Sequence, residues 1–197
     1  MRQALRILLV SWMIGGASGA LANGLGITFS AFAPGTQFHY SYDGVGGAGR
    51  FIDIYQGAQS GQHIVHRYDA SRGKLGPLRR IIAYDAQERM ISQERRALRT
   101  KTVWKPYHCE NSGLARCEHV RITYDSRTGA EKSSIRKVFA YSLRGRTLHV
   151  VENATSNRLK FTRKLDKNNV LLLRRETVRF NGKNVRRFTK LDRIVKP

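Results

Sequence analysis

The sequence predicts a mainly β protein whose strands form an antiparallel meander, arranged as an open barrel, a half-barrel or a sandwich. Apolar and aromatic residues alternate with polar ones in segment after segment, which is the period of a strand with one buried face. Turn sequences rich in Gly, Asp and Asn separate these segments at intervals too short for crossover helices. We therefore expect hairpin connections throughout and at most one short helix, near residues 86–99.

The alternation is clearest at Phe38, Tyr40 and Tyr42, and again at Val120 and Ile122. Turn sequences bound these two segments and the other candidates. Further strands are expected at residues 50–56, 62–68, 78–84, 134–143, 147–152, 158–165, 170–180 and 185–194. Turns are expected between them at residues 43–44, 59–61, 72–74, 127–129, 144–146, 166–169 and 181–183.

Residues 85–100 fit two interpretations. Asp85 and Glu88 have the spacing of a capping box, and an apolar stripe at helical spacing follows them. The alternative is a turn at 85–88 and a strand that continues toward Trp104. A Tyr-Asp pair recurs just before a turn at residues 42–43, 68–69, 84–85 and 124–125, and its neighbours lead into strands, so we favour the strand.

The first 22 residues predict a cleavable secretory signal peptide. Arg2 and Arg6 precede an apolar stretch, and Ala20 and Ala22 provide small side chains before the cut. Interruptions by Ser and Gly argue against an uncleaved membrane anchor, which needs about 20 continuous apolar residues. We expect a single basic β domain at residues 23–197 that is periplasmic or secreted, with no transmembrane segment after cleavage.

The charge is extreme, at +22 over 197 residues. Such a charge attracts polyanions, although a solvated surface without a dedicated partner has the same composition. Residues 158–197 hold 14 Lys and Arg against three acids. The expected anion-binding residues lie there: Arg158, Lys160, Lys164, Arg174, Arg175, Arg186 and Arg187. Nucleic acid is possible but not preferred, because the phenylalanines do not share a clear face with the charges.

Cys109 and Cys117 are the two cysteines of the chain. An isolated pair in an oxidising compartment most simply forms one disulfide. Closing so short a loop would stabilise the fold by roughly 2–3 kcal/mol. The spacing does not match the Cys-x-x-Cys pattern of redox-active pairs.

No catalytic, cofactor or metal motif is apparent. The chain has no Gly-x-Ser-x-Gly elbow and no His-Glu-x-x-His pattern, so no cofactor and no metal site are predicted. His108 and His119 flank the cysteines and could form an acid/base pair if the hairpin brought them together. A secreted hydrolase such as a nuclease is therefore the alternative function.

The preferred function is an exported binding or scaffolding protein whose cationic surface engages an anionic envelope component, namely lipid, lipopolysaccharide or polysaccharide. The meander is also compatible with a lipid-carrier-like open barrel. A contiguous apolar cavity would favour a carrier, and a core filled by side chains would favour a surface-binding module. An outer-membrane barrel is disfavoured, because Arg and Lys occupy both faces of residues 170–194.

Overall fold

The computed structural model describes residues 27–44, 47–71, 74–86, 88–105, 108–110, 115–154, 158–180 and 183–197. The predicted signal peptide at residues 1–22 lies outside them. The described chain contains one short 3-10 helix, η1 (Phe29–Ala31), and thirteen strands. The strands are β1 (Gln37–Asp43), β2 (Gly49–Gln59), β3 (Gln62–Ser71), β4 (Lys74–Tyr84), β5 (Met90–Arg95), β6 (Thr100–Trp104), β7 (His108–Glu110), β8 (Ala115–Asp125), β9 (Glu131–Arg144), β10 (Thr147–Ala154), β11 (Arg158–Leu165), β12 (Leu171–Phe180) and β13 (Lys183–Val195).

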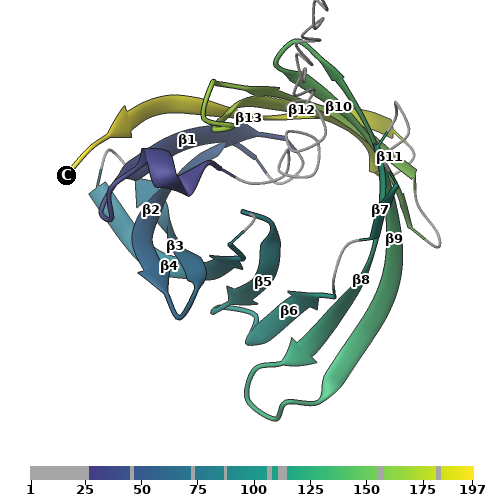
Figure 1. The fold of residues 1–197 in the computed structure, drawn as a ribbon, viewed down its shortest axis with the longest axis horizontal. Helices are drawn as coiled ribbons and strands as arrows, with labels where there is room; N and C mark the ends of the chain where they lie inside the picture. The colour runs from purple at the N-terminus through teal and green to yellow at the C-terminus, as the bar shows by residue number, and fades with distance from the viewer. Residues whose placement is uncertain are drawn as a thin grey trace, which may run out of the picture.

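All the strands belong to one antiparallel sheet that closes on itself (Figure 1). Most neighbours in the sheet are also neighbours in sequence, as expected for a meander. Two pairings between strands that are not consecutive in sequence complete the ring: β1 with β13, and β6 with β8. The short strand β7 pairs with β8 beyond the end of β6. The predicted mainly β meander is confirmed, and among the predicted arrangements the structure is a closed barrel of twelve strands.

The ambiguous segment at 85–100 forms a turn followed by two strands, β5 and β6, with no helix in its described residues. The Asp85 carboxylate accepts the backbone N–H of Arg89 at 2.9 Å and bonds to the Arg89 side chain at 2.7 Å. Glu88 does not cap a helix, because its carboxylate accepts the N–H of Phe29 at 3.0 Å. The two residues with capping-box spacing therefore have separate roles: Asp85 stabilises a turn, and Glu88 contacts a segment that is distant in sequence.

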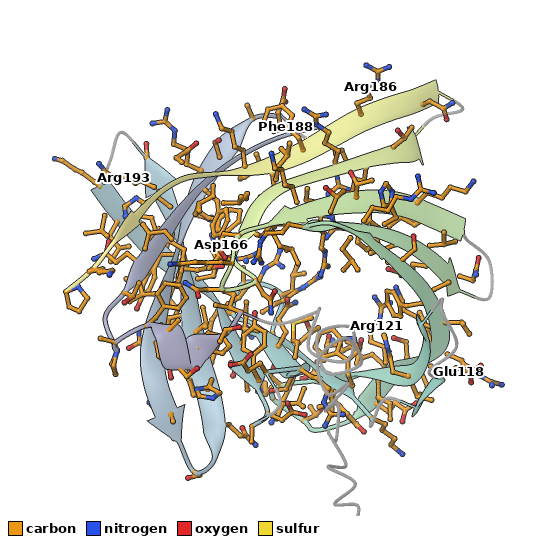
Figure 2. The ribbon with its side chains drawn as sticks, turned by 45° about the horizontal axis from the view of Figure 1, so that its top comes forward. Glu118, Arg121, Asp166, Arg186, Phe188 and Arg193 are labelled. Carbon is orange, nitrogen blue, oxygen red and sulfur yellow. The ribbon has the colours of Figure 1, made fainter. Side chains whose placement is uncertain are left out.

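The pairing register separates an inner and an outer face of the ring. Register partners share a face, and successive residues of a strand alternate faces. Following the partners of Phe38 around the ring assigns Asp53, Arg67 and Arg121 to the inner face. Figure 2 shows Arg121 inside the ring, and Glu118, Arg186 and Arg193 on its outside.

The apolar core lies inside the ring, against β1 to β4. Its fully buried members include Phe29, Phe38 and Val170, and partly buried Phe32 and Leu191 pack against them. Phe29 comes from η1, which lies within the curve of β1 and β2 (Figure 1). Side chains from the η1 segment thus fill this part of the barrel.

Backbone hydrogen bonds fix the η1 segment in place. The N–H of Thr28 donates to the carbonyl of Asn168 at 2.9 Å, and the N–H of Gly35 donates to the carbonyl of Tyr55 at 2.6 Å. Asn168 lies in the predicted turn at 166–169, where the Asp166 carboxylate accepts the N–H groups of Asn168 and Val170 at 2.8 Å each. One end of the barrel is therefore held by contacts from three separate parts of the chain.

Candidate functional site

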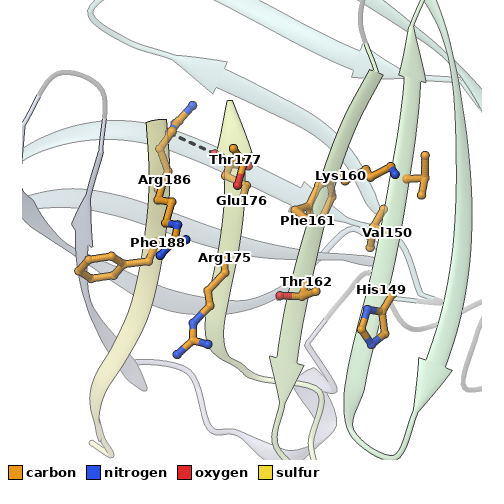
Figure 3. Close-up of a pocket in the computed structure, with 12 residues that line it drawn as sticks. His149, Val150, Lys160, Phe161, Thr162, Arg175, Glu176, Thr177, Arg186 and Phe188 are labelled. Carbon is orange, nitrogen blue, oxygen red and sulfur yellow. Dashed lines mark ion pairs between the residues drawn. The ribbon is translucent and has the colours of Figure 1, made fainter. Parts of the chain in front are cut away.

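A groove with a volume of about 790 Å³ crosses the outside of β10 to β13 (Figure 3). Two rows of outward side chains bound the groove. The row of residues between them, which includes Phe161 and Glu176, lines the floor of the groove, while its register assigns it to the inner face of the sheet. One bounding row is His149, Thr162, Arg175 and Phe188, and the other is Val151, Lys160, Thr177 and Arg186.

The groove is cationic. Lys160, Arg175 and Arg186 are exposed and stand on its two sides. Glu176 is the one acidic residue among the described residues that line the groove. Its carboxylate bonds to Arg174 at 2.5 Å and to Arg187 at 3.1 Å on the inner face. The outward charges of the groove are therefore not neutralised by a lining carboxylate.

The seven basic residues predicted to bind anions do not share one face. Lys160, Lys164, Arg175 and Arg186 are exposed on the outer face. Arg174 and Arg187 belong to the inner face by register, with Glu176 between them as a shared partner. Arg158 begins β11, and its side chain lies outside the described part of the structure.

The inner face carries a second population of basic residues. Arg67 forms two 2.7 Å bonds to Asp53, and Lys137 bonds to Glu152. Arg80 has a different partner, the amide oxygen of Gln93 at 3.3 Å. These side chains come from β3, β4 and β9, so the closed ring directs basic residues from distant parts of the chain into one interior.

Arg121 is the least neutralised of these residues. Its Nε is buried without a hydrogen-bond partner, and within the described chain no carboxylate lies within ion-pair distance of its guanidinium. Burial and then the charge of Arg95 lower the pKa of Arg121. Burial followed by the charges of Arg67 and Arg95 lowers the pKa of Arg80 to about 10. These shifts reflect desolvation and mutual repulsion.

Lys137 is affected in the same way. Burial, followed by the charges of Arg121 and Arg174, lowers its pKa to about 8, although Glu152 is its ion-pair partner. Two arginines from β8 and β12 thus act on one lysine from β9. Charges on different sides of the ring are close enough to influence each other.

The backbone register assigns His108 and His119, the two histidines of the predicted hydrolase, to opposite faces of the sheet. His108 on β7 is the register partner of Glu118, and Glu118 directly precedes His119 on β8. His119 is 4% exposed, stacks on Phe139 at 4.7 Å, and faces the interior. Burial and then the charges of Lys137 and Arg121 lower its pKa to about 4. The side chain of His108 lies outside the described part of the structure, so the acid/base pair stays a prediction.

Cys109 and Cys117 are direct partners in the β7–β8 register. The backbone pairing places the two residues opposite each other across a hairpin, as a cross-strand disulfide requires. Their side chains lie outside the described part, so the disulfide stays a prediction.

Charge density along the sequence points to the C-terminal strands and does not indicate the inner basic residues Arg67, Arg80 and Arg121. A usable signal lies in the strand period, since Arg67 shares the parity of buried Val65, and Arg80 that of buried Ile82. On β3 and β4 the basic residue at the parity of the buried apolar neighbour points inward.

Comparison with known proteins adds no relative. No protein-family model, no curated protein and no solved structure matches the chain. The described residues include no helix that is both long and apolar enough to cross a membrane. They also contain no group of three or more His, Cys, Asp or Glu side chains arranged to hold a metal ion.

Proposed function

We propose that this chain is an exported binding protein that holds an acidic polysaccharide in the outer groove of β10 to β13. The observation that carries the proposal is the placement of Lys160, Arg175 and Arg186 on both sides of a groove that crosses four strands. The predicted signal peptide at residues 1–22 supports export and therefore a ligand outside the cytoplasm.

The shape of the groove favours an extended ligand. Neighbouring strands lie about 4.8 Å apart and the two side-chain rows lie about 7 Å apart, so the cations stand along a path rather than around a point. A polymer with repeated carboxylates or sulfates can meet several of them at once. The filled core beside β1 to β4 supports a surface-binding module over a carrier with an apolar cavity there.

Each exposed ion pair contributes up to about 1 kcal/mol, so losing three cations should weaken binding by roughly tenfold to a hundredfold. The test is binding of residues 23–197, the predicted mature chain, to alginate and to dextran sulfate by calorimetry at low salt. The variant is K160Q/R175Q/R186Q. The matched control is K74Q/K101Q/R127Q, which removes the same charge from exposed positions outside the groove.

Weakened binding in the groove variant, with the control near wild type, would support the proposal. Equal loss in both variants would show attraction by net charge alone and would overturn it. Binding to vesicles containing an anionic phospholipid, without binding to either polysaccharide, would also overturn it and identify a lipid surface as the ligand.

A further inference from the structure

The interior of the barrel contains basic side chains that the outer groove does not use. Three described carboxylates of the interior are already paired with basic side chains: Asp53 with Arg67, Glu152 with Lys137, and Glu176 with Arg174 and Arg187. Arg121 and Arg80 have no such partner among the described residues. The interior therefore keeps an excess of positive charge.

Arg121 lies at the centre of this excess. It is two residues from His119 and two from Thr123 on β8, so all three belong to the inner face. His119 is the register partner of Lys137 on β9. Along β8, Arg121 is therefore flanked by His119 and Thr123. Its direct register partners are Trp104 on β6 and Ile135 on β9, and Lys137 is its diagonal neighbour on β9.

Leaving this arrangement without a ligand is energetically unfavourable. A buried donor without an acceptor is destabilising, more so when it is charged, and such donors are rare in native proteins. The buried Nε of Arg121 is one of them. An anion beside Arg121 would supply the missing acceptor and offset the repulsion from Arg95 and Lys137, whose charges act on the same region.

The available donors indicate the chemistry of the anion. A guanidinium presents several N–H groups in a fixed fork that matches phosphate oxygens. The hydroxyls of Thr102 and Thr123 share one hydrogen bond of 3.4 Å on the same face, so one of the two hydroxyls keeps its proton as a neutral donor. A tetrahedral oxyanion with several acceptor oxygens suits the guanidinium, ammonium and hydroxyl groups that β6, β8 and β9 place on the inner face.

We propose that Arg121, with Lys137 and the hydroxyl of Thr123, binds one oxyanion of the phosphate class inside the barrel. The anion is either free phosphate or the phosphate group of a lipid, which share this chemistry. The site is separate from the outer groove, since Arg121 and Arg175 belong to opposite faces of the sheet. It therefore does not depend on the polysaccharide proposal.

The test uses the mature chain, with inorganic phosphate and dihexanoyl phosphatidic acid as probes in calorimetry. The variant is R121Q. One control is R136Q on the outer face of β9, where Arg136 is 70% exposed and bonds to Glu118. The second control is R175Q in the outer groove. We expect R121Q to weaken binding at least tenfold and both controls to change it less than twofold.

Binding of both probes would identify the phosphate group as sufficient, and binding of the lipid alone would show that its chains contribute. Either result, when lost in R121Q, supports the site. Wild-type affinity in R121Q, an equal loss in R175Q, or no binding of either probe at millimolar concentration would overturn it.

A second measurement does not depend on how R121Q folds. The imidazole of His119 can be titrated by NMR in the wild-type chain with and without the bound probe. An anion beside Arg121 favours the charged imidazolium and should raise the pKa of His119. An unchanged pKa at saturating probe would show that the anion binds elsewhere and would overturn the proposal.

Discussion

Removing the carboxylate of Asp53 is expected to lower the free energy of unfolding by about 3 kcal/mol. Asp53 on β2 is directly opposite Arg67 on β3 and receives two hydrogen bonds from its guanidinium, each 2.7 Å long. The same guanidinium lies 4.0 Å from the centre of the Phe51 ring. In D53A the charge of Arg67 stays inside the barrel without a counter-charge.

The magnitude follows from burial. Breaking a buried ion pair by removing one partner costs about 3–5 kcal/mol. The side chains of Asp53 and Arg67 are 8% and 25% exposed, so partial hydration of the arginine places the cost at the lower end. With a urea m-value of about 2 kcal/mol/M, the unfolding midpoint should fall by about 1.5 M.

Two further variants make the measurement decisive. Asp69 pairs with Arg79 at 2.5 Å, but these side chains are 44% and 47% exposed, so D69A should cost less than about 1 kcal/mol. The double variant D53A/R67M removes both charges and should recover part of the stability that D53A loses. Urea unfolding followed by Trp104 fluorescence compares all three. A cost of D53A no larger than that of D69A would refute the reasoning.

Three other predictions concern stability. F29A should cost about 3–5 kcal/mol by the same urea assay, because Phe29 is fully buried with its ring 4.9 Å from those of Tyr55 and Tyr84; a cost below 1 kcal/mol would show that η1 does not hold the core. The pKa of His119 is about 4 in the folded chain and about 6.5 in the unfolded chain, so between these pH values the unfolded state binds more protons. The free energy of unfolding should therefore fall by up to about 3 kcal/mol as the pH drops from 6.5 toward 4. H119Q should flatten this pH dependence, and an unchanged pH slope would contradict the assignment. If Cys109 and Cys117 form the predicted disulfide, the urea-denatured mature chain should show no thiol reactive toward Ellman's reagent, and C109S/C117S should cost about 2–3 kcal/mol; two reactive thiols would rule the bond out.

The strands and turns could be predicted because they depend on local chemistry. Asp125 ends its strand as expected, with its carboxylate accepting the N–H groups of Arg127 and Thr128 at 2.9 and 3.1 Å. The same Tyr-Asp signal is wrong at residues 68–69, which lie within β3, where Asp69 bonds to a side chain of the next strand. A carboxylate that can cap a turn can equally join a cross-strand pair, and the sequence alone does not distinguish the two.

The inner site could not be predicted in the same way, because both faces of many strands carry basic residues. On β12, adjacent Arg174 and Arg175 point to opposite faces, one bonded to Glu176 and the other exposed at the groove. Which of the two faces the interior depends on the pairing of β6 with β8 and of β1 with β13, both distant in sequence. Closure of the ring therefore places basic residues of β3, β4, β8 and β9 in the same interior, and local sequence patterns do not specify this closure.

The two groups of basic residues should therefore respond differently to salt. Lys160, Arg175 and Arg186 are exposed, so at 0.15 M ionic strength their attraction for a polymer is screened beyond about 8 Å. Arg121 acts from a buried Nε inside a ring of protein, where screening is weaker and desolvation already lowers its pKa. Binding at the groove should thus weaken steeply as salt rises, while binding at Arg121 should weaken less. If both reactions showed the same steep dependence, the separation of an outer and an inner site would not hold.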